Sequence, residues 1–433
     1  MVQVRSPRPA RSVRGTPTLL RLATALTVLA GIAFGGLGLQ GLTGRSQAVD
    51  RARAETADLV RLQTIRTKVV TADAAAGVDV LLGPDQVTLT PHDYDWALQP
   101  AVIGMSIASR QADDAYPLAV ANLRLTQYTG QVGAARNLSV SGNSAGAADA
   151  LTAAAVTLQG EILPRLLAVQ RASERRLATD QDDAARGPLL AYAGAALGLL
   201  TLIAIQLWLT ARTRRILNVP LAVASILLAV MTVAGLVIVS ASQRQVDGVS
   251  TGIQPLVRQL VEARVAAFNA RSVETLSVVA RSETAQDPTW RASLASAQES
   301  LARAEQVASP TPPHAGADAP RAEVQAATTL LGDYAAVHEG MVRLARTARV
   351  RAQDRDAERV LATSPAPDAL PGAFESFDVA TGALLARQVE AADDGWSGAN
   401  SHLVLAGWLW LVAGLGAAVL AWRGLSARLR EYD

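Results

Sequence analysis

The sequence contains no cysteine and few aromatic residues. Without cysteine, the chain has no disulfide framework, thiolate zinc site, iron–sulfur cluster or thiol nucleophile. Aromatic residues make up only 4% of the chain although 50% of it is hydrophobic, so the apolar part is mainly alanine, leucine and valine. Because the 433 residues have a mean hydropathy of +0.21, we expect these residues to be concentrated in membrane-spanning runs.

The chain also lacks an excess of charge of either sign. It has 40 basic and 38 acidic residues, and the basic ones are almost all arginine, with Lys68 as the one lysine. A basic tract interleaved with aromatic residues is typical of nucleic-acid binding, and the sequence contains no such tract. The sequence therefore predicts no nucleic-acid partner.

Four apolar runs are long enough to cross a bilayer, and none has a charge near its centre. They are residues 18–42, 188–211, 216–241 and 403–425. The first could be a signal peptide, but its apolar run is roughly twice the usual length and no small-residue cleavage site clearly follows it. We therefore predict four transmembrane helices, the first of them retained as an anchor.

The short segments that flank these spans are rich in arginine. Arg5, Arg8, Arg11 and Arg14 precede the first span, Arg212, Arg214 and Arg215 lie between the second and third, and Arg423, Arg428 and Arg430 follow the fourth. Because short arginine-rich segments stay in the cytoplasm, the tails 1–17 and 426–433 and the loop 212–215 are predicted to be cytoplasmic. The protein is then a multi-pass plasma-membrane protein with both termini inside.

The two long segments, 43–187 and 242–402, are predicted to be extracytoplasmic helical bundles. Apolar residues recur in them at steps of three and four, which places them on one helix face. The first such stripe is Leu59, Leu62, Ile65, Val69, Ala72, Ala76 and Val80, and the second is Ile253, Leu256, Leu260, Ala263 and Ala267. The fold class is therefore all-α, with four transmembrane helices and two extracytoplasmic helical-bundle domains. Both halves share one plan, and whether they arose by duplication stays open.

Some helix boundaries follow from glycine, proline and capping residues. The run Ser141-Gly142-Asn143-Ser144 is predicted to separate two helices of the first bundle. In the second bundle, Asp287-Pro288 is predicted to stop one helix, and a short helix is expected from Trp290. A later helix has paired apolar positions across 330–345, typical of a wide buried face.

Candidate ligand-binding residues are few, and each also has a plain structural explanation. His338, beside Tyr334 on one helix, could line a pocket or could only satisfy a hydrogen bond inside the bundle. Arg61 and Arg66 on the first outer helix could meet an anionic ligand or could be solvated helix surface. The ligand site is otherwise unknown.

The sequence has no pattern typical of catalysis or of metal binding. Its four histidines share no ligand spacing, and it contains no phosphate-binding loop, nucleophile elbow or dinucleotide-binding glycine pattern. We therefore expect no enzyme activity, no metal site and no cofactor.

Glycines occur four residues apart in two of the spans. Gly31 and Gly35 in the first span, and Gly194 and Gly198 in the second, have the spacing that lets helices approach closely. They could pack spans of one chain, could form a homodimer, or could arise by chance in a chain rich in small residues.

Glycine also lies where the spans meet the outer segments. The junctions at Gly41 to Gly44 and at Gly187-Pro188 are predicted hinges through which the outer helices could move the spans.

A helical bundle between two spans resembles the extracytoplasmic sensor modules of bacterial chemoreceptors and histidine kinases. A closer resemblance is carried by LTQYTGQVGAAR (125–136), EILPRLL (161–167), DYAAVHEGMVRLAR (333–346) and AFESFDVATGALL (373–385). These segments are similar to four-span membrane proteins of high-GC Gram-positive bacteria that accompany an extracytoplasmic glutamine-binding lipoprotein and the soluble serine/threonine protein kinase G. The resemblance implies a relay between an amino-acid-loaded solute-binding protein outside and a serine/threonine kinase inside. It assigns no ligand residues.

The function expected from these features is that of a non-enzymatic membrane sensor or signal-transmitting adaptor. A cell-envelope scaffold without signalling is the first alternative, and a transporter subunit is the second. Transport is disfavoured because the spans have no ionisable residue at their centres and offer only Gln206 and Pro220 near their ends.

Overall fold

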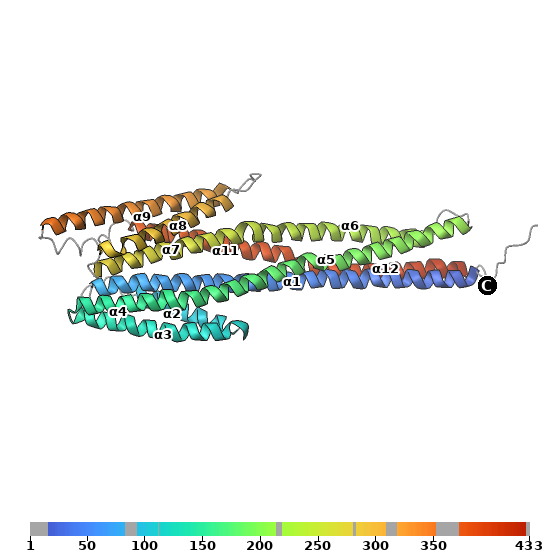
Figure 1. The fold of residues 1–433 in the computed structure, drawn as a ribbon. Coiled ribbons are helices and arrows are strands. Elements are labelled where there is room, and N and C mark those ends of the chain that lie inside the picture. The colour runs from blue at the N-terminus through green and yellow to red at the C-terminus, as the bar shows by residue number, and fades with distance from the viewer. Residues whose placement is uncertain are drawn as a thin grey trace, which may run out of the picture. The chain divides into compact units, whose positions relative to one another are not determined.

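The computed structural model describes residues 16–82, 93–110, 112–213, 219–279, 283–308, 318–351 and 372–429. These residues are almost entirely helical and contain no strand (Figure 1). The all-α prediction is therefore confirmed. The predicted N-terminal tail up to residue 15, residues 214 and 215 of the 212–215 loop, and the last four residues lie outside the described residues.

Both halves of the chain follow one plan of span, outer helices and span, but the π-helix precedes the returning helix in the first half and follows the outgoing span in the second. The first half has α1 (Thr16–Leu82), α2 (Asp93–Ala108), α3 (Ala112–Val140), α4 (Ser144–Thr157), the π-helix η3 (Leu158–Ile162) and α5 (Leu163–Thr213). The second half has α6 (Val219–Asp247), the π-helix η4 (Gly248–Ile253), α7 (Gln254–Val279), α8 (Glu283–Val307), α9 (Asp318–Arg351), α11 (Ala373–Asn400) and α12 (Leu403–Leu429). In each half, a helix leads out of an apolar span, two or more helices follow, and a last helix leads back to a span.

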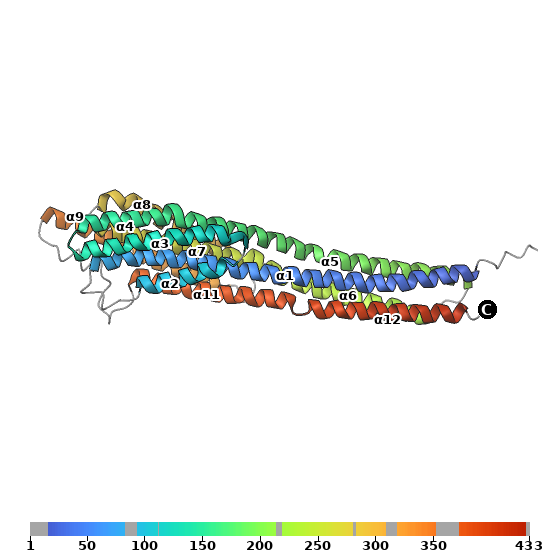
Figure 2. The same ribbon diagram turned by 90° about the horizontal axis from the view of Figure 1, so that it is seen from below.

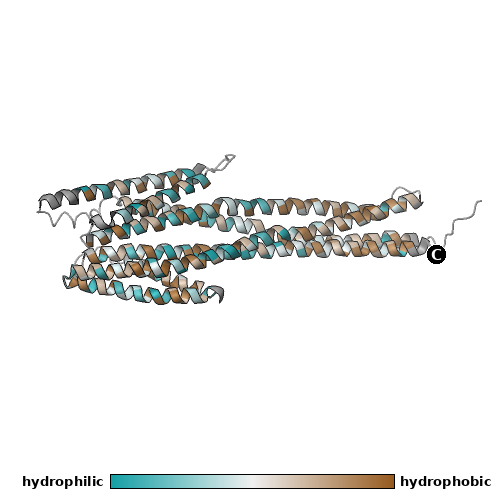
Figure 3. Cartoon of the chain, viewed as in Figure 1, coloured by the Kyte–Doolittle hydropathy of each residue, from teal (hydrophilic) through white to brown (hydrophobic). Residues whose placement is uncertain are grey.

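The chain divides into two compact units. We call Met1–Ala52, Ala178–Val246 and Trp396–Asp433 the membrane unit, and Arg53–Leu177 with Asp247–Gly395 the bundle unit. Four helical stretches of the described residues are long and apolar enough to span a membrane. Figure 3 shows hydrophobic residues concentrated along these spans. Large apolar side chains lie exposed on these helices, including Leu22, Leu200, Ile226 and Val412. Such exposure is typical of a surface that lipid covers, so the chain is a membrane protein.

In the membrane unit, the glycine pairs lie where helices of the same chain cross. A Cβ atom added at Gly31 would lie 2.8 Å from the Gly414 carbonyl oxygen of α12, and one at Gly35 would lie 3.0 Å from the Leu411 carbonyl oxygen. Added Cβ atoms at Gly194 and Gly198 of α5 would meet α1, at 2.9 Å from Leu37 Cβ and 3.2 Å from Phe34 Cβ. Glycine thus permits close packing inside one chain. The homodimer stays a prediction.

The predicted hinges are helical in the structure. Helix α1 continues through Gly41 and Gly44, and α5 continues through Gly187 and Pro188. A Cβ atom at Gly41 would lie 2.8 Å from the Ala191 backbone nitrogen, whereas a Cβ atom at Gly44 would meet nothing within 4 Å. Gly41 is therefore required for the approach of α1 to α5, and both glycines lie inside one uninterrupted helix.

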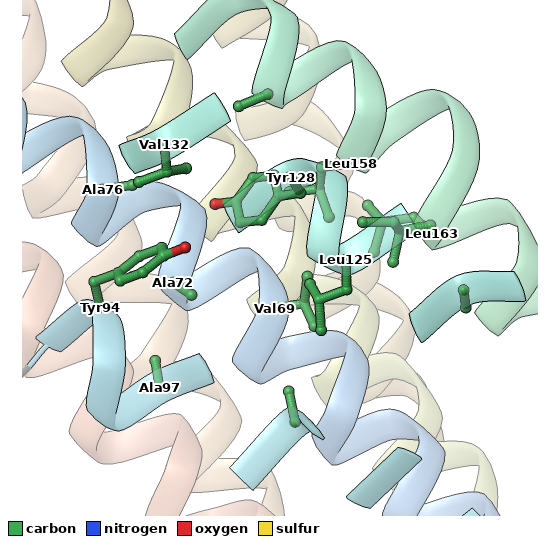
Figure 4. Packing of buried hydrophobic residues seen from close by; sticks show 14 of the residues in the cluster. Val69, Ala72, Ala76, Tyr94, Ala97, Leu125, Tyr128, Val132, Leu158 and Leu163 are labelled. Carbon is green, nitrogen blue, oxygen red and sulfur yellow. The ribbon is translucent and has the colours of Figure 1, made fainter. Parts of the chain in front are cut away.

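The bundle unit has one apolar core in each half. The first core packs α1, α2 and α3 against α4 and α5, and Figure 4 shows Val69 and Ala76 of α1 beside Leu125 and Val132 of α3. All seven residues of the first predicted stripe are buried. The second core packs α7, α8, α9 and α11, and it buries Leu256, Leu260, Ala263 and Ala267 of the second predicted stripe. The periodicity of the sequence identified both helix faces.

Helix boundaries match the sequence in one place and differ in another. Gly142 has a φ of +77°, and the Asn143 side chain accepts a hydrogen bond from the Gly146 backbone nitrogen at 2.9 Å, so the predicted break before α4 is confirmed. The predicted stop at Asp287-Pro288 is wrong, because α8 contains Pro288. Near the start of a helix, a proline interrupts few backbone hydrogen bonds.

The buried face of α9 is narrower than the sequence suggested. Leu331, Tyr334 and His338 are buried, but the Val337 side chain is 52% exposed. Leu330 and Ala335 are partly buried against the second core beside Leu331 and Tyr334, but at the pair Val337/His338 only His338 is covered. The side chains of Met341 and of 344–350 lie outside the described residues.

The two π-helices were not predicted from the sequence. In η3 the Leu163 backbone nitrogen donates to the Leu158 carbonyl oxygen, and in η4 the Gln254 nitrogen donates to the Val249 carbonyl oxygen, each five residues back. Each π-helix contains glycine and ends two residues before a proline. Proline has no N–H to donate to the carbonyl four residues earlier, so the helix changes its bonding there. Glycine followed by proline within one turn was the available signal.

Candidate functional site

Helices α1 and α7 form a contact seam inside the bundle unit. Val70 and Ala74 of α1 pack with Val261, Val265 and Phe268 of α7 in a small apolar cluster. We call this contact the α1–α7 seam. Polar side chains lie beside this seam, and their hydrogen bonds and ion pairs connect α1 of the first core to α7 of the second core.

Arg66 forms a two-pronged ion pair across the seam. Its Nη1 and Nη2 atoms donate to Oε1 and Oε2 of Glu262 at 2.5 and 2.9 Å. The Arg66 side chain is only 8% exposed, so the solvated-surface interpretation of this residue is wrong. Arg61 instead pairs with Asp58 one turn earlier on α1 and keeps a side chain that is 35% exposed. The structure therefore does not bring these two arginines to one anion site.

A buried carboxyl group lies where α1, α3 and α7 meet. Asp73 accepts a hydrogen bond from the Tyr128 hydroxyl at 3.1 Å and another from the Ser272 hydroxyl. Burial raises the pKa of Asp73 above its ordinary value, and these two donors oppose the rise. Burial also raises the pKa of Tyr128, and the neighbouring Asp73 adds to that rise. We refer to Asp73, Tyr128 and Ser272 as the Asp73 cluster.

A second buried polar group lies on α7 within the other core. Glu274 accepts hydrogen bonds from Arg271 at 2.7 Å, from the Tyr334 hydroxyl at 3.0 Å and from His338 Nδ1 at 2.8 Å. The Trp290 ring stacks on the His338 ring with centroids 3.6 Å apart. We call these five residues the Glu274 cluster. The structure thus brings Tyr334 and His338 together on one carboxylate. The buried His338 ring has a hydrogen-bond partner in Glu274.

The partners of Glu274 keep it ionised in spite of its burial. Burial by itself would raise the pKa of Glu274, but the hydrogen bond from His338 and the charge of Arg271 hold that pKa below its ordinary value. Burial and the nearby Glu274 both raise the pKa of Tyr334. Tyr334 is therefore a neutral donor to a carboxylate.

The Asp73 cluster and the Glu274 cluster both contain residues of helix α7. Ser272 reaches the first core, while Arg271 and Glu274 on either side of it in sequence hold the second. A small shift of α7 along or about its axis would change hydrogen bonds in both cores. Sequence reasoning missed Asp73 and Glu274, and the available signal was an acidic residue next to an apolar helix stripe.

The described residues contain no group of three or more histidine, aspartate or glutamate side chains that could hold a metal ion. His338 is hydrogen-bonded to Glu274 through Nδ1, and His402 lies in the turn between α11 and α12. The other two histidines, His92 and His314, lie outside the described residues.

One family model matches part of the chain. Residues 48–182 are similar to the actinobacterial sensor domain. No curated protein and no solved structure matched the sequence significantly. The match suggests a sensor role and fits a sensor-type membrane protein of actinobacteria, as the resemblance to membrane proteins of high-GC Gram-positive bacteria implied.

The segment similar to the sensor domain begins on α1, ends on α5 and contains every buried residue of the first core except Val279 of α7. Asp73 and Tyr128 lie within it, whereas Ser272 comes from α7 outside it. The α1–α7 seam therefore connects this segment to the second half of the chain.

We expect replacement of Asp73 by asparagine to stabilise the segment similar to the sensor domain at neutral pH. A buried carboxyl with a raised folded-state pKa favours the neutral form, so its contribution to stability is present at low pH and is lost as the pH rises through that pKa. Asparagine keeps an acceptor for Tyr128 or Ser272 and carries no charge. The variant should be more stable than the wild type at pH 7, by on the order of 1 kcal/mol, and the difference should vanish near pH 4.

Thermal unfolding of the full-length protein in mild detergent, followed by circular dichroism at both pH values, measures this difference. Asp149→Asn on the exposed face of α4 is the matched control and should change stability at neither pH. A wild-type protein that is more stable than Asp73→Asn at pH 7 would contradict the expectation.

Proposed function

We propose that this protein is a membrane sensor that relays an extracytoplasmic signal to a cytoplasmic serine/threonine kinase. A solute-binding protein loaded with an amino acid is the proposed outer partner. One observation carries the proposal: the segment similar to the sensor domain is continued at both ends, without a helix break, by the membrane-spanning parts of α1 and α5. A signal received by this segment can pass into the membrane through the helices themselves.

The proposed relay requires two arrangements of the outer helices. A docked partner shifts such an equilibrium only by its difference in affinity for the two states, and a few kcal/mol is sufficient. Movement of helix α7 would change hydrogen bonds in both the Asp73 cluster and the Glu274 cluster, because both contain residues of α7. Helix α7 joins α6 through η4, where conversion between π- and α-helical bonding would turn α7 about its axis.

The test is purification of the tagged full-length protein in mild detergent from its own membranes, with identification of the co-purifying proteins. The relay predicts that a solute-binding protein and a serine/threonine kinase both co-purify, and that the amino acid changes kinase activity in reconstituted membranes. If only outer partners bind and kinase activity does not respond, the envelope scaffold replaces the relay.

The relay also requires the predicted topology. Because the chain has no native cysteine, single cysteines report sidedness directly. Ser141→Cys, at the turn between α3 and α4, should be labelled by an impermeant maleimide in intact cells. Ala427→Cys, near the end of α12, should be labelled only after permeabilisation. The reverse pattern would contradict cytoplasmic termini.

A further inference from the structure

The membrane unit has a groove between α1 and α12 at the N-terminal end of α1. It has a volume of about 500 Å³ and is lined by Arg21, Thr24, Ala25, Val28, Leu29 and Trp422. The five α1 residues follow helical spacing on one face. The two helices run side by side in both views (Figures 1 and 2), and the close contacts of Gly31 and Gly35 with α12 lie just beyond the groove.

The groove is polar at one end and apolar along the rest. Arg21 is the only charged residue in its lining, and Leu29 lies eight residues further, which is about 12 Å along the helix. The Thr24 hydroxyl is satisfied by the Leu20 carbonyl oxygen at 2.9 Å. A bound molecule would therefore meet one strong cationic donor and then an apolar trough.

Arg21 has no acidic partner among the described residues. The described acidic residues of the membrane unit are Asp50 on α1 and Asp180, Asp182 and Asp183 on α5. Asp50 is 29 residues from Arg21 along α1, about 43 Å away, and Arg51 pairs with Asp180 at that level. The end of the unit that contains Arg21 also carries Arg423, and the arginine-rich flanking sequences join it there. No described acidic residue of the membrane unit therefore supplies a negative charge at Arg21.

We propose that this groove binds one anionic phospholipid. Its phosphate lies at the Arg21 guanidinium, and an acyl chain lies against Ala25, Val28 and Leu29. Trp422 forms the wall from α12 at the level of the headgroup, where tryptophan is enriched in membrane proteins. Charge complementarity selects an anionic headgroup, and the apolar trough selects a lipid over a free anion.

The test uses the full-length protein in detergent and counts retained lipids by native mass spectrometry during titration with phosphatidylglycerol or phosphatidylcholine. We expect one phosphatidylglycerol per chain at low lipid concentration and at least fivefold weaker binding of phosphatidylcholine. Arg21→Gln should weaken phosphatidylglycerol binding about fivefold. The matched control is Arg423→Gln, next to Trp422 but outside the groove, and it should change binding less than twofold.

A second variant tests the apolar part separately. Ala25→Trp fills the trough and keeps Arg21, so it should also reduce retention of phosphatidylglycerol about fivefold. Circular dichroism and size-exclusion profiles equal to those of the wild type show that each variant is folded. Equal losses in Arg21→Gln and Arg423→Gln, equal retention of the two lipids, or full displacement by inorganic phosphate would each overturn the proposal.

Discussion

Replacement of Glu274 by alanine is expected to destabilise the bundle unit by about 3 kcal/mol. The change removes the acceptor of three donors: the Arg271 guanidinium, the Tyr334 hydroxyl and the His338 ring. Tyr334 and His338 are buried, so their donors cannot recover full hydration, and Arg271, with a side chain 23% exposed, loses its counter-charge. Denaturant unfolding of the full-length protein, followed by far-ultraviolet circular dichroism, measures the loss.

The control for this change is Glu299→Ala on α8. Glu299 pairs with Arg303 one turn later, but its side chain is 67% exposed, so removal should cost no more than about 0.5 kcal/mol. Similar losses in the two variants would show that the Glu274 cluster contributes no more than a surface pair.

The effect of Glu274→Ala should also depend on pH. The folded-state pKa of Glu274 is lowered, so its contribution is present above the ordinary glutamate value of 4.5 and is lost as the pH falls through the folded-state pKa. The difference between the wild type and the variant should therefore be largest near pH 7 and shrink below pH 4.5.

Alanine at Gly41 and alanine at Gly44 are expected to have opposite effects on stability. An added Cβ at Gly41 would lie 2.8 Å from the Ala191 nitrogen and 2.9 Å from the Gly187 carbonyl oxygen, so α1 and α5 must separate, at a cost of about 1–3 kcal/mol. At Gly44 the added methyl meets nothing within 4 Å, and the higher helix propensity of alanine should stabilise the protein by about 0.5–1 kcal/mol. Thermal unfolding in detergent measures whether each variant raises or lowers the stability of the protein.

The same pair of variants tests the relay. If the contact between α1 and α5 transmits the signal, Gly41→Ala should alter kinase output in reconstituted membranes, whereas Gly44→Ala should leave it unchanged. A Gly41→Ala variant as stable as Gly44→Ala would show that Gly41 is not at a close contact and would remove the structural basis of this test.

The sequence by itself determined the helical class and the spans. Apolar runs of this length can satisfy their backbone in lipid only as helices, and steps of three and four place one face of each outer helix in a core. The stripe from Leu59 to Val80 was therefore predictable residue by residue, and so was the break at Gly142, where a positive φ favours glycine. These features depend on neighbours close in sequence.

The tertiary structure alone decided which polar residues are partners. Arg66 and Glu262 are 196 residues apart, and Asp73 and Ser272 are 199 residues apart, so no local spacing predicts that they meet. Whether Arg66 is solvated or buried depends on the helix that covers it, which here is α7. The same reason explains Gly41, which a sequence identifies only as flexible: its role follows from the backbone of α5 packed against it.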